Sequence, residues 1–153
     1  MPAVTRDTIS ETPRPRLKAI LDETIPEDIW LVYCSVSAGK SVHPSFRFSL
    51  SRNGKVYFVE RSKKNKDHKV PFDKPLPKKP SSSLSAAQMA TIEASLKDLD
   101  FLHHPGYEGV DGRDGHYDVV RINQDGKIHT VVYYAVKNEL VDQLEKIANA
   151  LRH

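Results

Sequence analysis

Cysteine is nearly absent from this chain, which has one such residue among 153. No internal disulfide can therefore form. Cys34 lies in the apolar run 29–34, where a buried and unreactive thiol is expected. A chain without disulfides suits a reducing compartment, so we expect the protein in the cytoplasm, or in the periplasm if a signal peptide has been removed.

Long apolar stretches are also missing. No segment approaches the roughly 18 apolar residues that cross a membrane, so we expect no membrane span. Residues 1–13 are polar and lack the apolar centre of a signal peptide, which predicts a flexible tail. Residues 14–153 have the usual length of one domain, and the chain's 39% hydrophobic and 28% charged residues are ordinary for a globular protein.

Familiar catalytic and cofactor motifs do not occur. The sequence has no Gly-x-Ser-x-Gly, His-Glu-x-x-His or Cys-x-x-Cys pattern. Residues 38–41 match the end of a phosphate-binding loop, but Cys34 stands where that loop needs its first glycine, and Pro44 opposes a helix after Ser41. We therefore predict no catalytic residue, no metal ligand and no cofactor, and a binding protein rather than an enzyme.

The first half of the domain predicts a short helix followed by three strands. Pro15 suits the first turn of a helix that Pro26 would end, and residues 29–37 are rich in β-forming residues. Residues 46–50 and 56–60 flank Asn53-Gly54, a strong signal for a type I′ hairpin turn.

A type I′ turn at Asn53-Gly54 would fix the register of this hairpin. Leu50 would lie opposite Tyr57, and Arg47 would form a cross-strand ion pair with Glu60. One face would then be apolar and packed on the core, while the other would be largely exposed to water. The predicted apolar face comprises Phe46, Phe48, Leu50, Tyr57 and Val59.

Residues 61–83 predict an exposed loop. They hold four prolines, the basic run 61–66 and three serines at 81–83, so they can bury little apolar surface. A connection of this length inside a compact domain indicates either a linker or a functional loop.

The second half predicts a helix, a hairpin and a second helix. Ser85 and Gln88 form a capping box ahead of an apolar stripe that ends near Phe101-Leu102. Residues 117–122 and 128–136 predict a hairpin of open register, and residues 139–151 predict the last helix. We expect an α+β domain with the order (α)βββ–linker–αββα, in which an antiparallel sheet of about five strands carries two main helices on one face.

The loop from His103 to His116 gathers three imidazoles and three carboxylates, which makes it the alternative site for a hydrolase or a metal enzyme. However, it has neither His-x₃-His spacing nor the alternating oxygen ligands of a calcium loop. A structural turn is the preferred interpretation. His129 and Tyr133 alternate on a predicted strand, where a half-buried, hydrogen-bonded histidine is expected.

Charge is distributed unevenly along the chain. Residues 29–80 contain twelve Lys or Arg and three Asp or Glu, whereas residues 81–153 contain seven and eleven. Such a basic segment steers acidic partners, so we predict that the partner is another protein, with nucleic acid as the alternative. The predicted contact residues are Lys63, Lys64, Lys66, Lys69, Asp111, Asp114 and His116.

Two resemblances cover residues 46–151. The first is to a group of uncharacterised bacterial proteins, several of them envelope-associated. Their Asp-Gly-x-x-aromatic strand resembles residues 114–117, with an offset of one position, and their Gly-x-x-His-x-Val-x-aromatic strand resembles residues 126–133. The second resemblance is to emfourin-type inhibitors of thermolysin-like metalloproteases, and it concerns the order of the elements. That order is a hairpin, a Leu-Ser-x-x-Gln helix ending in Asp-Phe-Leu, a second hairpin and a final helix. These resemblances imply an inhibitor, immunity protein or accessory subunit, and they transfer no site residue.

Overall fold

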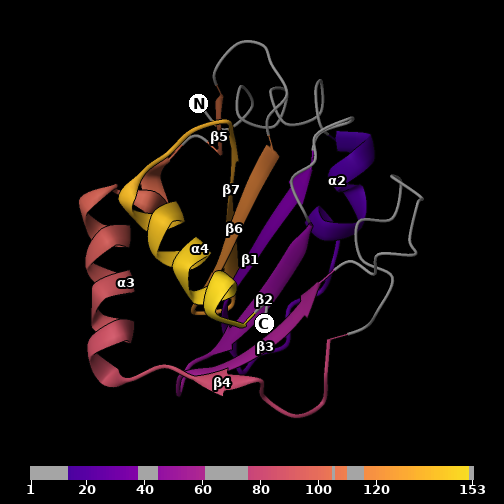
Figure 1. The fold of residues 1–153 in the computed structure, drawn as a ribbon. Coiled ribbons are helices and arrows are strands. Elements are labelled where there is room, and N and C mark those ends of the chain that lie inside the picture. The colour runs from indigo at the N-terminus through magenta and orange to yellow at the C-terminus, as the bar shows by residue number, and fades with distance from the viewer. Residues whose placement is uncertain (1–13, 38–44, 61–75, 105, 110–115, 152–153) are drawn as a thin grey trace.

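The computed structural model describes residues 14–37, 45–60, 76–104, 106–109 and 116–151 (Figure 1). Its elements, in chain order, are α2 (Arg14–Leu21), β1 (Ile29–Ser37), β2 (Phe46–Ser51), β3 (Lys55–Glu60), β4 (Ser82–Ser83), α3 (Ala86–Asp98), the 3₁₀ helix η1 (Phe101–His103), β5 (Tyr107–Gly109), β6 (His116–Gln124), β7 (Lys127–Tyr134) and α4 (Glu139–Leu151). The predicted α+β class is therefore confirmed.

The described strands form one seven-stranded sheet, where about five strands were predicted. Its order is β4-β3-β2-β1-β6-β7-β5. The two additional strands, β4 and β5, lie at the edges and contain two and three residues, too few to show an alternating pattern. All neighbours are antiparallel except β5, which pairs in parallel with β7, so the sheet is mixed.

Helices α3 and α4 lie together on one face of the sheet, as predicted (Figure 1). The main core forms between them and the strands, and a β-bulge between Ile29 and Leu31 lets the adjacent Trp30 and Leu31 both join it. Gln143 of α4 also donates a 2.8 Å hydrogen bond to Ser95 of α3. The largest fully buried side chains in this core include Tyr33, Phe46, Phe48, Leu50, Phe101, Ile122, Leu140 and Leu144.

The opposite face of the sheet is covered by α2. Leu17 and Ile20 of this helix pack with a second buried cluster drawn from the alternate positions of the central strands. A helix therefore covers this second face at the central strands as well, in addition to the face that was predicted to carry the two main helices. The strand members of the second cluster are Ile29, Val32, Cys34, Val36, Val119 and Val132.

The first hairpin is shifted by one residue from its predicted register. Leu50 lies opposite Val56 rather than Tyr57. The backbone N–H of Gly54 bonds to Ser51 O at 3.0 Å, and Gly54 has φ of +90°, whereas Asn53 is not among the residues with positive φ. The turn is therefore not type I′, which requires positive φ at both central residues.

This shift exchanges the two faces of β3. Val56 and Phe58 now pack on the main core, and Tyr57 packs against the second cluster. Arg47 lies opposite Val59, and it forms an ion pair of 2.7 Å with Glu23.

The second hairpin has the turn that was expected of the first. Gln124 pairs with Lys127, and the two residues between them, Asp125 and Gly126, have φ of 52° and 85°. Both values are positive, as a type I′ turn requires. Asn123 supports the turn by accepting a 3.1 Å hydrogen bond from the N–H of Gly126.

The two main helices begin at side-chain caps. Ser85 and Gln88 form the predicted capping box, with reciprocal hydrogen bonds of 2.8 and 3.1 Å. At α4, the side chain of Asn138 accepts a 2.9 Å hydrogen bond from the N–H of Val141.

Several predicted features lie partly or wholly outside the described residues. These are the tail 1–13, the phosphate-loop look-alike at 38–41 and the first fifteen residues of the basic loop, 61–75. The rest of that loop is largely exposed, and its last residues, Ser82 and Ser83, pair with β3 as β4. None of the described helices is long and apolar enough to pass through a membrane.

Candidate functional site

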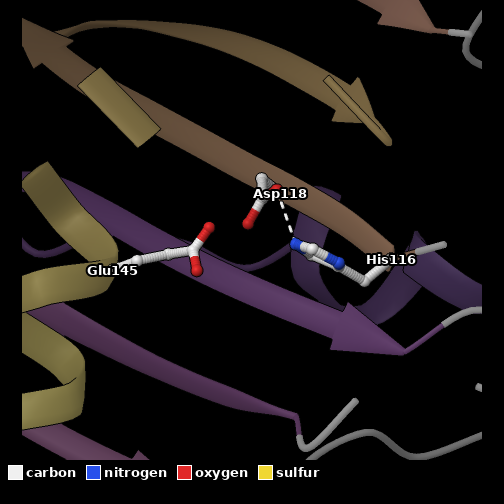
Figure 2. Close-up of side chains that lie close together, drawn as sticks. All are labelled: His116, Asp118 and Glu145. Carbon is white, nitrogen blue, oxygen red and sulfur yellow. Dashed lines mark ion pairs between the residues drawn. The ribbon is translucent and has the colours of Figure 1, made fainter. Parts of the chain in front are cut away.

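His116, Asp118 and Glu145 converge beside α4 (Figure 2). His116 and Asp118 are two positions apart on β6, so both side chains project towards the face that carries α4. Glu145 follows the buried Leu144 in the middle of α4. One ligand atom from each of the three side chains lies within 4.8 Å of the other two.

Asp118 is the buried member of this cluster, with 1% of its surface exposed. Its Oδ1 accepts a 2.5 Å hydrogen bond from the hydroxyl of Tyr33, which lies on β1. Its Oδ2 lies 3.0 Å from Nε2 of His116. The geometry of that contact is that of an ion pair rather than an aligned hydrogen bond, and Oδ2 accepts no hydrogen bond within the described part of the chain.

The electrostatics of the cluster follow from its burial and its two carboxylates. Burial, followed by the charge of Asp118, raises the pKa of Glu145. The close polar contact with Asp118 raises the pKa of His116, although burial acts in the opposite direction. Burial, and then Asp118, raises the pKa of Tyr33 well above 10, so its hydroxyl remains a donor at neutral pH.

The structure places one of the seven predicted contact residues, His116, in this cluster. Lys63, Lys64, Lys66, Lys69, Asp111 and Asp114 lie outside the described residues. Sequence reasoning grouped His116 with the histidines that precede it and missed Asp118 and Glu145. The alternation of His116 and Asp118 on one strand was a local signal for the pair, but Glu145 is 27 positions away from Asp118 and no local pattern indicates it.

The other two imidazoles of the predicted loop pair with different carboxylates. His103 Nδ1 lies 2.6 Å from Asp100, and both side chains are exposed. His104 Nε2 lies 3.3 Å from Glu108. The structure therefore does not combine the loop's imidazoles into one site with His116.

His129 and Tyr133 share a face of β7, as predicted, and each makes a ring contact with the segment that follows α3. The ring of His129 packs edge-on against Phe101 at 5.4 Å, and that of Tyr133 against His104 at 5.7 Å. Burial lowers the pKa of His129. Its Nε2 makes no hydrogen bond within the described residues, whereas backbone hydrogen bonds with His104 and Phe101 act to raise its pKa, so the expected half-buried, hydrogen-bonded histidine is found.

A groove of about 480 Å³ lies between α3, η1 and the end of β6. Its wall includes Trp30, Leu96 and Phe101, together with Leu102, which is half exposed. Polar groups on the rim include the His103–Asp100 pair described above.

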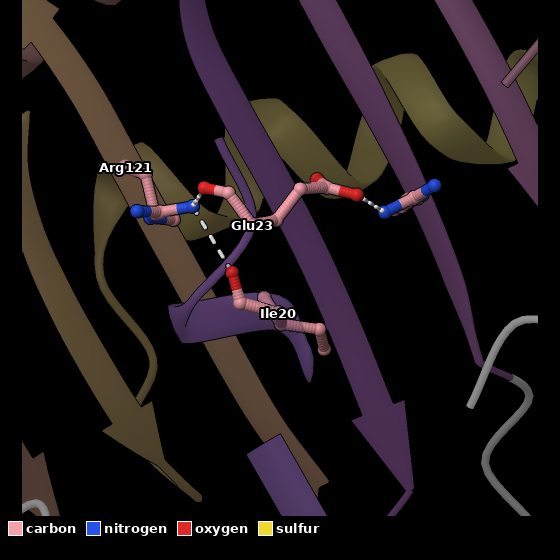
Figure 3. Close-up of polar contacts among 4 residues, drawn as sticks. Ile20, Glu23 and Arg121 are labelled. Atoms are coloured by element: carbon pink, nitrogen blue, oxygen red, sulfur yellow. Dashed lines mark hydrogen bonds and ion pairs between the residues drawn. The ribbon is translucent and has the colours of Figure 1, made fainter. Parts of the chain in front are cut away.

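Arg121 is a buried cation that sequence reasoning did not select. Its side chain crosses from β6 to the end of α2, where Nη1 donates hydrogen bonds of 3.0 Å to the carbonyl of Ile20 and 2.8 Å to that of Glu23 (Figure 3). Its Nε also donates to Thr130 at 3.2 Å. These contacts satisfy two carbonyls near the end of α2 and attach the helix to the sheet, which is a structural role.

Cys34 is fully buried in the second cluster, as predicted. Burial raises the pKa of its thiol to about 12, so the thiolate does not form at neutral pH. The side chain therefore contributes packing and no nucleophile.

Comparisons with known proteins do not assign this chain to a family. Neither the protein-family models nor the curated proteins include a match to this sequence.

Proposed function

We propose that this chain is a non-enzymatic protein-binding module of the inhibitor or immunity type, which recognises an acidic surface on its partner through the basic segment around β3 and β4. The observation that carries the proposal is a set of exposed lysines at one edge of the sheet. Lys78 and Lys79 precede β4, and Lys55 pairs with Ser83 of β4. The side chains of all three lysines are exposed.

The chain's own sequence extends this positive charge. Residues 61–75 join β3 to the stretch that contains Lys78, and they include Lys63, Lys64, Lys66 and Lys69. Charges of one sign gathered on a surface accelerate association with an oppositely charged partner and orient the encounter. A protein with an acidic face is the partner that this charge fits.

A protein partner is favoured over nucleic acid by the positions of the aromatic rings. Proteins that bind single strands present exposed aromatic side chains on which bases stack. In β2 and β3, Phe46 and Phe48 are buried in the main core, and Phe58 is partly buried against it. Both faces of the central strands are covered by helices, so the described residues provide no open sheet for stacking.

The inhibitor or immunity character of the proposal rests on the resemblance in element order. The succession of a hairpin, a capped helix, a second hairpin and a final helix is the pattern shared with emfourin-type inhibitors. The lone buried thiol suits action in the cytoplasm.

Binding can be measured by biolayer interferometry against a thermolysin-like metalloprotease and against the proteins encoded by the neighbouring genes. The test variant is Lys78→Glu with Lys79→Glu. The matched control is Lys97→Glu with Lys127→Glu, which changes the net charge equally at exposed positions in α3 and at the start of β7. We expect one of these proteins to bind the wild-type chain, the test variant to lose at least tenfold in affinity, and the control to change less than threefold.

Three results would overturn the proposal. These are binding to none of the candidate proteins, equal losses in the test and control variants, or tight binding to duplex DNA that weakens steeply with salt and is lost in the test variant. The last result would assign the same lysines to nucleic acid.

A further inference from the structure

We propose that His116, Asp118 and Glu145 bind a divalent transition-metal ion, with Zn²⁺ as the reference metal. The inference concerns the face that carries α4 and is independent of the proposed protein-binding surface at β4. The three side chains supply one imidazole nitrogen and two carboxylate groups, all of them common metal ligands.

The separation of the first two ligands fits a bound ion. Nε2 of His116 and Oδ2 of Asp118 are 3.0 Å apart. Two ligands of one Zn²⁺, each at about 2.0–2.1 Å, lie about 2.8–3.4 Å from each other in octahedral or tetrahedral geometry. Glu145 offers a carboxylate oxygen within 4.8 Å of both and is only half buried on α4, so binding one ion requires this side chain to move closer by a change of rotamer.

Asp118 provides an independent indication of a ligand. Its carboxylate is almost completely buried, and Oδ2 faces into the cluster without accepting a hydrogen bond from any described residue. Its contact with His116 at 3.0 Å is an ion pair that is not aligned as a hydrogen bond, and a buried carboxylate oxygen without an aligned donor is costly. A metal ion at the centre of the cluster would satisfy it.

Tyr33 occupies the position of an outer-shell partner. Its hydroxyl donates 2.5 Å to Oδ1 of Asp118, which orients the carboxylate and leaves Oδ2 directed at the cluster. Ligating carboxylates in metal sites are commonly held by hydrogen bonds of this kind.

The charge balance also favours a cation. Asp118 and Glu145 place two carboxylates close together in a partly buried site, with the single imidazole of His116 beside them. A divalent ion neutralises both. The imidazole ligand favours Zn²⁺, Fe²⁺, Ni²⁺ or Cu²⁺ over Mg²⁺ and Ca²⁺, which prefer oxygen ligands alone.

Isothermal titration of the EDTA-treated full chain with ZnCl₂, and with CoCl₂ followed by visible absorption, tests the site. We expect one ion to bind per chain with micromolar or tighter affinity, and Co²⁺ to give a visible band. Glu145→Gln and His116→Ala should each weaken binding at least tenfold. Glu145→Gln is the main variant because it preserves the shape of a half-buried side chain, and circular dichroism confirms that each variant is folded.

The matched control is His103→Ala with Asp100→Asn. It removes another histidine–carboxylate pair, whose side chains lie 2.6 Å apart and are exposed. Within the described structure, this pair has no third ligand close enough to form a group of three. We expect less than a twofold change in affinity for this control.

Three outcomes would overturn the metal site. The chain binds no stoichiometric ion, or Glu145→Gln and His116→Ala bind Zn²⁺ as tightly as the wild type, or Ca²⁺ or Mg²⁺ binds more tightly than Zn²⁺. The first would leave the cluster as a structural ion pair, and the second would assign binding to other histidines. Neither bears on the lysines at β4, so failure here is distinguishable from failure of the proposed function.

Discussion

The hydroxyl of Tyr33 on β1 donates a 2.5 Å hydrogen bond to Oδ1 of Asp118 on β6. The two residues occupy diagonal positions on neighbouring strands, since Tyr33 lies directly opposite Val120 and Asp118 opposite Ser35. Both side chains are buried on the α4 face of the sheet. The bond therefore gives a buried carboxylate a donor that only the pairing of β1 with β6 provides.

Tyr33→Phe should destabilise the fold, because it leaves Oδ1 of Asp118 buried without its donor. Hydrogen bonds to charged groups contribute about 1.5–3 kcal/mol, and we expect a loss of this size in the free energy of unfolding measured with urea. Tyr57→Phe, at a half-buried tyrosine on the opposite face, should cost about 0.5 kcal/mol or less. Equal losses in the two variants would contradict the special role of the Tyr33 hydroxyl.

Arg121→Met should loosen α2, since the methionine cannot donate to the carbonyls of Ile20 and Glu23. We expect the free energy of unfolding to fall by about 1.5–3 kcal/mol, and the amides of α2 to exchange hydrogen faster. Arg52→Met is the control, because among the described residues this exposed arginine makes one hydrogen bond, of 3.2 Å, to the carbonyl of Asn123. A loss in Arg121→Met no larger than in the control would show that α2 is held by its apolar side chains alone.

His129 and His103 should titrate on opposite sides of the ordinary histidine value of about 6.5. Burial lowers the pKa of His129, with His104 and His103 adding repulsion, whereas the hydrogen bond to Asp100 raises the pKa of His103. The imidazole proton resonances, followed by NMR from pH 4.5 to 9, measure both values in one sample. The reverse order would show that His129 gains a partner in solution.

The lowered pKa of His129 has a definite sign for stability. As pH falls, the unfolded chain takes up the proton first, so the stability due to neutral His129 is present above about pH 6.5 and is lost as pH falls through the folded pKa. Urea denaturation at pH 7.5 and pH 5 measures the free energy of unfolding at each pH. The decrease in this free energy from pH 7.5 to pH 5 should be smaller for His129→Gln than for the wild type. An unchanged pH dependence would contradict this.

Gly54→Ala should cost more than Gly126→Ala, although both glycines have positive φ. At Gly126, with φ of +85°, nothing lies within 4 Å of an added Cβ, so we expect only the backbone cost of about 1–2 kcal/mol. At Gly54, with φ of +90°, the added Cβ would lie 2.9 Å from the carbonyl oxygen of Leu84, which must move. Thermal unfolding of both variants measures the difference, and a smaller loss in Gly54→Ala would mean that the segment around β4 yields freely.

Much of the secondary structure could be predicted because its signals are local. The capping box at Ser85 and Gln88 marks the start of α3, and the predicted bounds 139–151 agree with α4. Strand β1 was likewise predicted at 29–37. These signals act within a few residues, where backbone preference and side-chain capping decide the conformation.

The register of the first hairpin was mispredicted because its turn allows more than one conformation. Asn53-Gly54 favours type I′, yet the chain uses only Gly54 at positive φ and shifts β3 by one residue. The shift places Val56 and Phe58 in the main core, while Tyr57 packs against the second cluster, which includes two residues of α2. With apolar groups covering both faces, the alternation of the strand alone could not select the register.

The sequence by itself determined where the main helices and the longer strands form, that they combine as an α+β domain, and that Cys34 is buried among apolar residues. Tertiary structure alone decided that Glu145 meets His116 and Asp118, and that Arg121 reaches the carbonyls at the end of α2. Periodicity and capping operate over a few residues, whereas these contacts join positions 27 or more apart in the chain. Their partners are set by sheet order and helix packing, which no short segment specifies.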